Sequence, residues 1–147
     1  YTYIDYCVVA SRGYNYATAF EVALKLKELA YIIADPHSSA DFQHGPLALV
    51  EHGFPVIAAV PEGILTGELM TFFRQLKERG ADLIMISADA DALELAQTPL
   101  AIPAGIPEWV SPLVMIVQGQ LFALGITLAK RFNPDQPRGI TKVTLTM

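Results

Sequence analysis

Hydrophobic and polar positions follow two alternating patterns along the chain. Short apolar runs, rich in β-branched residues, predict strands at 5–11, 55–60, 83–87 and 100–102. Longer stretches with helical spacing predict helices at 15–34, 46–52, 65–79 and 109–131, with a short acidic turn or helix at 89–97. This alternation is typical of βαβ units, in which helices cover both faces of a parallel sheet. We therefore predict an α/β protein, a three-layer αβα sandwich with a flavodoxin-like parallel sheet.

Proline and glycine mark the ends of these elements. Asp35-Pro36 ends the first helix and opens a polar loop that runs to Gln43. Gly80 follows a basic last turn, which is typical of a helix C-terminus. The two prolines in 133–139 exclude regular structure there. We predict one domain at 1–131 and a C-terminal tail at 132–147.

Composition and charge narrow the class of protein. Of 147 residues, 52% are hydrophobic, which is enough for a compact core, and the net charge of −5 without a basic run argues against nucleic acid as a partner. The single cysteine, Cys7, excludes an intramolecular disulfide and fits a reducing, cytoplasmic location. Because the chain opens with Tyr1 and not with methionine, we expect a fragment of a longer protein.

The apolar segment 113–129 raises the question of a membrane span. It contains Gln118, Gly119, Gln120 and Gly125 and is slightly short for the hydrocarbon core of a bilayer. A buried helix, or one packed on another domain or subunit, is the better interpretation, and no membrane partner is expected.

Three charged residues lie on one face of the first predicted helix. Glu21, Lys25 and Glu28 are spaced at i, i+4 and i+7. One interpretation is a salt-bridged surface stripe of modest stabilising value. The other places Glu28 at the carboxyl ends of the strands, where ligands bind in this fold, as a proton-transfer base.

Other candidate residues lie in loops and in the tail. His44, followed by Gly45-Pro46, is either a neutral-pH acid/base catalyst or a histidine bonded to a local carbonyl. Arg12-Gly13 stands between a strand and a helix, where an anion can bind. Lys142 is either an ordinary tail lysine or an amine that forms a Schiff base with a carbonyl substrate. The histidines lack zinc-ligand spacing, so no metal is expected.

Taken together, these residues resemble a sugar isomerase (SIS) domain. The similarity covers nearly the whole chain and rests on the segments 11–13, 19–28, 43–49, 54–57 and 135–142. It implies that Glu28 moves a proton between sugar carbons 1 and 2, and that His44 assists ring opening across a dimer interface. It also implies that Lys142 engages the ketose carbonyl, with Lys25 near carbon 1 and Glu21 in support.

Within that family, the chain is most similar to the second SIS domain of glucosamine-6-phosphate synthase and of two-SIS glucosamine-6-phosphate deaminases. Its loop 39–42 looks more like the deaminase branch. The resemblance implies an aminosugar-phosphate isomerase or deaminase acting on a hexose or aminohexose 6-phosphate without a cofactor. It further implies a homodimer. It also implies a preceding SIS domain, which holds the phosphate group of the substrate and is needed for activity. Two alternatives stay open: the isomerase part of the synthase, and a non-catalytic sugar-phosphate sensor.

Overall fold

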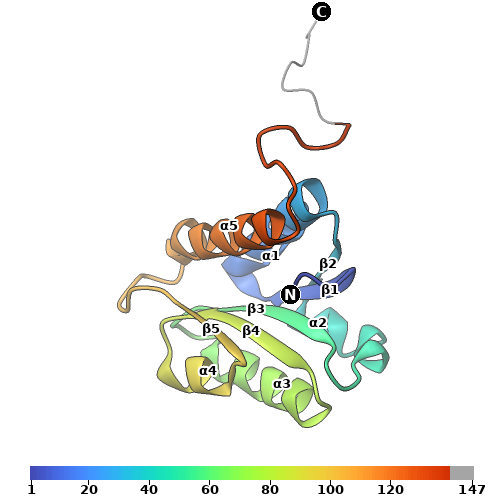
Figure 1. Ribbon diagram of the computed structural model, residues 1–147. Coiled ribbons are helices and arrows are strands. Elements are labelled where there is room, and N and C mark those ends of the chain that lie inside the picture. Colours follow the sequence, from blue (N-terminus) through green and yellow to red (C-terminus); the bar gives the residue numbers. More distant parts are fainter. Residues whose placement is uncertain (140–147) are drawn as a thin grey trace, which may run out of the picture.

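The computed structural model describes residues 1–139, which form a five-stranded, all-parallel sheet in the order β2-β1-β3-β4-β5 (Figure 1). The strands are β1 Tyr6–Ser11, β2 Ile33–Ser38, β3 Pro55–Val60, β4 Asp82–Ser87 and β5 Thr98–Ala101. Strand order reverses between β1 and β3, since the chain adds β2 on one side of β1 and β3 on the other. This arrangement confirms the predicted three-layer α/β fold.

Helices cover both faces of the sheet, as Figure 1 shows. One layer holds α1 (Tyr16–Lys25), its π-helical continuation η2 (Leu26–Ala30) and α5 (Ser111–Ala129). The opposite layer holds α2 (Ser39–Phe42), α3 (Thr66–Glu78) and α4 (Ala90–Leu95). Two short 3₁₀ turns, η1 (Gly13–Asn15) and η3 (Pro46–Leu49), connect these elements.

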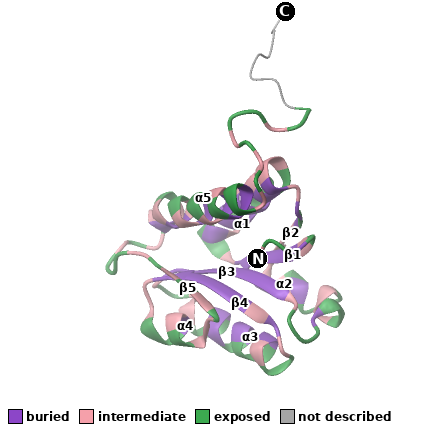
Figure 2. Cartoon of the chain, viewed as in Figure 1, coloured by how far each residue is buried: buried purple, intermediate pink, exposed green. Residues whose placement is uncertain are grey.

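The central strands are buried on both faces, which explains their nearly unbroken apolar sequence (Figure 2). Successive side chains point to opposite faces, so neighbours in sequence enter different cores. Val9 and Ile57 pack under α1 and α5, whereas Val8 and Val56 pack against α3. The alternation of side chains along each strand therefore decides which of the two hydrophobic cores a strand residue enters.

The first predicted helix was too long, and the strand that follows it was missed. The helix ends at Ala30, Tyr31 adopts a left-handed backbone with φ of 55°, and residues 33–38 pair with β1 as the strand β2. Ile32 and Ala34 are buried while Ile33 between them is 65% exposed, which is strand periodicity. Pro36 is tolerated because β2 is an edge strand, with one side free of ladder hydrogen bonds.

The helix α5 is long and apolar enough to cross a membrane by length and composition, with a mean hydropathy of 1.7. Core helices of soluble proteins pass the same test, and α5 packs on α1 and on the sheet through Met115, Ala123 and Ile126. Its outer side still carries exposed apolar side chains, at Leu113, Val117, Leu121 and Leu128.

Candidate active site

The charged row on the first helix is formed as predicted. Lys25 Nζ donates a hydrogen bond to Glu28 Oε2 at 2.8 Å and lies 3.7 Å from Glu21 Oε1. This hydrogen bond to Glu28 is the main reason why the pKa of Lys25 is raised. The three side chains keep 28–37% of their surface exposed, so the row is open on one side.

Glu28 lies in the middle of the π-helical turn η2. Such turns are rare and often occur at functional sites, because the wider turn shifts the direction of the side chains. The turn ends at Tyr31, and the N–H of Ile32 donates to the carbonyl of Leu26 at 3.2 Å, which closes the helix end. The local backbone is therefore irregular where the candidate base lies.

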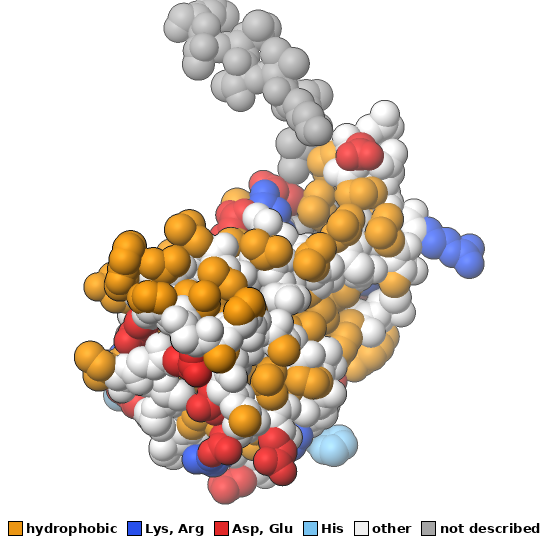
Figure 3. All heavy atoms as spheres, turned by 90° about the vertical axis from the view of Figure 1, so that its left-hand side faces the viewer, with side chains coloured by type: hydrophobic (Ala, Val, Ile, Leu, Met, Phe, Trp, Pro, Cys, Tyr) orange, Lys and Arg blue, Asp and Glu red, His pale blue; other side chains and the backbone are white. Residues whose placement is uncertain are grey.

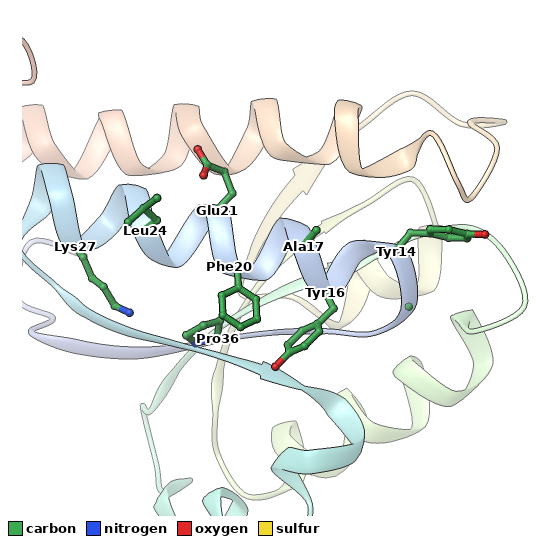
Figure 4. Close-up of a pocket in the computed structure, with 9 residues that line it drawn as sticks. Tyr14, Tyr16, Ala17, Phe20, Glu21, Leu24, Lys27 and Pro36 are labelled. Atoms are coloured by element: carbon green, nitrogen blue, oxygen red, sulfur yellow. The ribbon is translucent and has the colours of Figure 1, made fainter. Parts of the chain in front are cut away.

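The structure corrects the predicted location of Glu28 in the sheet. Helix α1 starts beyond the carboxyl end of β1, runs antiparallel to the strands, and ends where β2 begins, as the stretch from Tyr14 to Lys27 shows in Figure 4. Glu28 therefore lies at the amino end of the strands and not in the crevice at their carboxyl ends. A crossover helix must return along the sheet, so only its first turn stands at the carboxyl ends.

His44 belongs to a different layer of the molecule. It is exposed and follows α2, whose Phe42 is buried against Phe72 of α3 with ring centroids 5.8 Å apart. The row of Glu21, Lys25 and Glu28 lies on the opposite layer, so one chain does not bring His44 to it. A contribution of His44 across a dimer interface stays a prediction, and Lys142 lies outside the described residues.

At the carboxyl ends of β1 and β3, polar side chains contact one another and the nearby backbone. The guanidinium of Arg12 forms an ion pair with Glu68 of α3. Gly13 has a φ of 61°, and a Cβ placed on it would stand 2.7 Å from Leu65 Cδ1. The carboxylate of Glu108 accepts the N–H of Ile64 at 3.0 Å. That Arg12 and Gly13 bind substrate remains a prediction. In the structure, Arg12 pairs with Glu68 and Gly13 lies close to Leu65.

An apolar groove of about 660 Å³ runs along the outer side of α1 (Figure 4). Tyr16 and Phe20, whose ring centroids are 4.9 Å apart, lie near Pro36 of the edge strand, and Lys27 marks the far end. Glu21 points from α1 toward α5, away from Phe20 and Pro36. Glu21 nevertheless lines one edge of the groove, so the charged row borders the groove at this residue.

Charge is unevenly distributed over the end of the molecule shown in Figure 3. Hydrophobic side chains spread over the upper part, which contains α1 and α5, while most visible carboxylates lie in the lower part, over α3 and α4. Within residues 1–139, no group of three or more histidine, cysteine or acidic side chains is placed to hold a metal ion. Burial raises the pKa of Cys7 to about 12, so its thiol is not poised as a nucleophile.

One contact that the sequence analysis did not predict joins the residue after η2 to the residues that follow α5. The guanidinium carbon of Arg138 is 4.4 Å from the ring centroid of Tyr31, three positions after Glu28. They are 107 positions apart, so no local pattern could have paired them.

Comparison with known proteins gives the family. The SIS domain model matches residues 6–129, and the chain belongs to this family. It is 37% identical over 131 residues to a glutamine–fructose-6-phosphate aminotransferase of Pyrococcus horikoshii, an alignment that covers 89% of this chain and 22% of that protein. The chain therefore spans less than a quarter of the length of such curated relatives.

Solved structures agree with the sequence match. The C-terminal domain of glucosamine-fructose-6-phosphate aminotransferase from Francisella tularensis superposes with a TM-score of 0.82 at 31% identity, covering 92% of this chain and 38% of that one. Glucosamine-6-phosphate deaminase from Thermotoga maritima gives 0.72 at 20% identity, covering 95% and 40%, and shows the shared fold. The predicted resemblance to SIS domains of this kind is confirmed.

Proposed function

We propose that this chain is the isomerase domain of an aminosugar-phosphate enzyme, in which Glu28 transfers the proton that interconverts aldose and ketose forms. The observation that carries the proposal is the 2.8 Å contact between Lys25 and Glu28 within a row of three charged side chains. Glu28, the last residue of that row, lies on a π-helical turn of a chain that belongs to the sugar isomerase family. A surface stripe alone requires no such turn.

The proposed chemistry needs a base next to a positive charge. Glu28 takes the proton from the sugar carbon beside the carbonyl or imine. The electrons of that C–H bond form the C1=C2 bond of an enediol or enolamine, and the π pair of the C=O or C=N bond moves onto its oxygen or nitrogen. The same carboxyl group then returns the proton to the neighbouring carbon. The ammonium of Lys25 stabilises the oxyanion that develops, and Glu21 helps to hold it. His44 opens the sugar ring, and Lys142 engages the open-chain carbonyl.

The site is proposed to be completed by other parts of the assembly. The row is open on one side, and His44 lies on the opposite layer of its own chain. The relatives are several times longer than this chain. We propose that a preceding SIS domain supplies the phosphate contacts and that a second copy supplies His44, in a cytoplasmic homodimer.

The names of the relatives help to decide between an aminotransferase and a deaminase. Curated relatives at 37% and 39% identity are named aminotransferases, while the deaminase structure is matched at 20% identity. This supports the aminotransferase over the deaminase, although loop 39–42 resembles the deaminase branch. Both assign the same proton transfer to Glu28.

The experiment is solvent-deuterium exchange at carbon 2 of glucosamine 6-phosphate and at carbon 1 of fructose 6-phosphate, followed by NMR with the full-length protein. We expect exchange by the wild type and a loss of about 100-fold or more in Glu28→Gln, the usual magnitude for removing a general base. Glu78→Gln, an exposed carboxylate at the end of α3, is the matched control and should exchange normally.

The same samples separate the alternatives. Dependence of glucosamine 6-phosphate formation on glutamine marks the aminotransferase, and release of ammonia from glucosamine 6-phosphate marks the deaminase. Saturable sugar-phosphate binding without any carbon-bound exchange would overturn the proposal in favour of a sensing module.

A further inference from the structure

The outer face of the first helix is apolar in its middle and charged at both edges. Phe20 is 52% exposed and Leu24 is 44% exposed, and both line the groove along α1. Glu21 and Lys27 line the same groove, and Figure 4 shows Glu21 directed toward α5 and Lys27 directed away from α5, toward the side of Pro36. We call Phe20, Glu21, Leu24 and Lys27 the α1 face. Exposed apolar side chains between charged edges are typical of a protein–protein contact.

The two charges are placed symmetrically about Leu24. Each lies three positions from Leu24, which is about 4.5 Å along the helix axis and about 60° around it. A two-fold axis that lies in the plane of the α1 face at Leu24, perpendicular to the line joining Glu21 and Lys27, therefore exchanges the positions of the two charges. On a second copy related by that axis, a lysine meets each glutamate. This is the self-complementarity that a two-fold interface requires.

The charges of the α1 face are available for such a contact. Lys27 is exposed and forms no ion pair with any side chain of residues 1–139. Glu21 keeps 37% of its side chain exposed, although Lys25 lies 3.7 Å from it. The outer side of α5 also exposes apolar side chains, but Ser111–Ala129 contains no charged residue that could fix how two copies align. The symmetry of charge therefore favours α1 over α5.

We propose that a second copy of this chain docks on the α1 face, with Leu24 at the two-fold axis and two ion pairs between Glu21 and Lys27 across it. The partner's Lys27 then lies beside Glu21, which already has Lys25 as a neighbour. The second copy thus adds a cation to the border of the charged row, which is open on one side. The inference builds on the homodimer of the proposed function and names the surface through which it forms.

The arrangement is tested by Leu24→Cys in the full-length protein, with disulfide formation under air oxidation followed by mass spectrometry of linked peptides. A peptide that contains position 24 and is linked to itself comes only from two copies, and Cys7 is buried. The control is Ala17→Cys, which lies in the same groove seven positions from the axis. Two copies of position 17 are about 21 Å apart in the proposed dimer, beyond the reach of a disulfide. We expect the link at position 24 to form at least about tenfold faster than the link at position 17.

The ion pairs are tested in the Leu24→Cys background. Lys27→Glu places like charges opposite each other in both pairs and should slow the link at position 24 about tenfold or more. Adding Glu21→Lys exchanges the charges on both copies and should restore the rate to within about twofold of Leu24→Cys alone. A link rate that ignores the first change, or that the second change fails to restore, would refute the ion pairs.

Two results would place the contact elsewhere. Leu113→Cys is the matched variant on the other apolar face, since Leu113 of α5 is 74% exposed. A faster link at position 113 than at position 24 would overturn the inference. A cysteine at position 24 that reacts neither with a second copy nor with maleimide is covered by another part of the full-length chain, and this result also overturns it.

The inference and the proposed function fail separately, because the link is measured without substrate. If the wild type performs no deuterium exchange but the link at position 24 forms as expected, the proposed function fails and the interface stands. If the wild type exchanges but position 24 does not link, the proposed proton transfer stands and the α1 face is not the dimer interface.

Discussion

The two ends of the sheet carry different kinds of polar groups. At the carboxyl ends of the strands, the charges are paired internally: Arg12 with Glu68, and Glu108 with the N–H of Ile64. Toward the amino ends, Glu21 and Lys25 of α1 and Glu28 of the irregular turn η2 form a row that is about one-third exposed. Both sets of groups are partly exposed, so the two ends differ in arrangement: Arg12 and Glu68 link a loop to α3, whereas the three charges of the row share one helical segment.

This difference departs from the general rule for where ligands bind in parallel α/β sheets. In open parallel α/β sheets, ligands generally bind outside the carboxyl ends, at the point where strand order reverses. Here that point lies between β1 and β3, and the carboxylate of Glu108 occupies the loop beyond β3, where an anionic ligand would otherwise meet free backbone N–H groups. The candidate chemistry lies instead at the far end of the crossover helix.

The largest expected effect in stability concerns the contact that holds the row in place. A Cβ at Gly119 of α5 would collide with Cγ2 of Val22, the residue next to Glu21, whereas a Cβ at Gly125 meets nothing within 4 Å. Gly119→Ala should therefore lower the free energy of unfolding by about 2 kcal/mol, because it overpacks the α1–α5 contact. Gly125→Ala, the control in the same helix, should stabilise by up to about 1 kcal/mol.

Urea denaturation of both variants measures this contrast. Gly119→Ala should also lower the rate of carbon-bound deuterium exchange, because it displaces the helical segment that carries Glu28. The ion pair of Arg12 and Glu68 should be unchanged. Equal stability of the two variants would show that α1 and α5 are not in tight contact at this glycine.

A smaller effect is expected from a change at the carboxyl ends of the strands. Glu108→Ala leaves the N–H of Ile64 without its partner and should cost about 1 kcal/mol of unfolding free energy, as usual for such a hydrogen bond. Deuterium exchange on the sugar should stay within about twofold of the wild type. A large loss of exchange in Glu108→Ala, with normal stability, would place catalysis at this end and reverse the comparison.

The smallest expected effect concerns the burial of the Cys7 thiol and the pH dependence of stability that follows from it. Cys7 of β1 packs under α1 and η2, and burial raises the pKa of its thiol from 9.0 to about 12. Because the folded-state pKa is the higher one, the stability linked to this group is complete below pH 9 and is lost as the pH rises toward 12. At pH 10 the expected loss is about 1 kcal/mol relative to pH 7.

The measurement is urea denaturation of the wild type and Cys7→Ala at pH 7 to 10. The wild type should lose more stability than Cys7→Ala across this range. Tyr1 and Tyr6, whose pKa values are also raised by burial, contribute to both proteins and cancel in the difference. Parallel pH profiles would mean that water reaches the thiol.

Local sequence patterns predicted most of the fold. The buried strands at 55–60 and 83–87 were identified from their β-branched apolar runs, and the structure has them at Pro55–Val60 and Asp82–Ser87. The edge strand β2 was not found, because Asp35-Pro36-His37 breaks its apolar pattern and the helical spacing before it runs on. An edge strand needs little burial and can contain proline, so its sequence carries a weak signal.

The sequence by itself determined the α/β class, the central strands, and the face that Glu21, Lys25 and Glu28 share, because these depend on residue spacing within one element. Only the tertiary structure decided which end of the sheet this face occupies, that His44 belongs to the opposite layer, and that Tyr31 contacts Arg138. Those relations join residues far apart in the chain, and they follow from how helices cross over the sheet and pack, which local spacing does not specify.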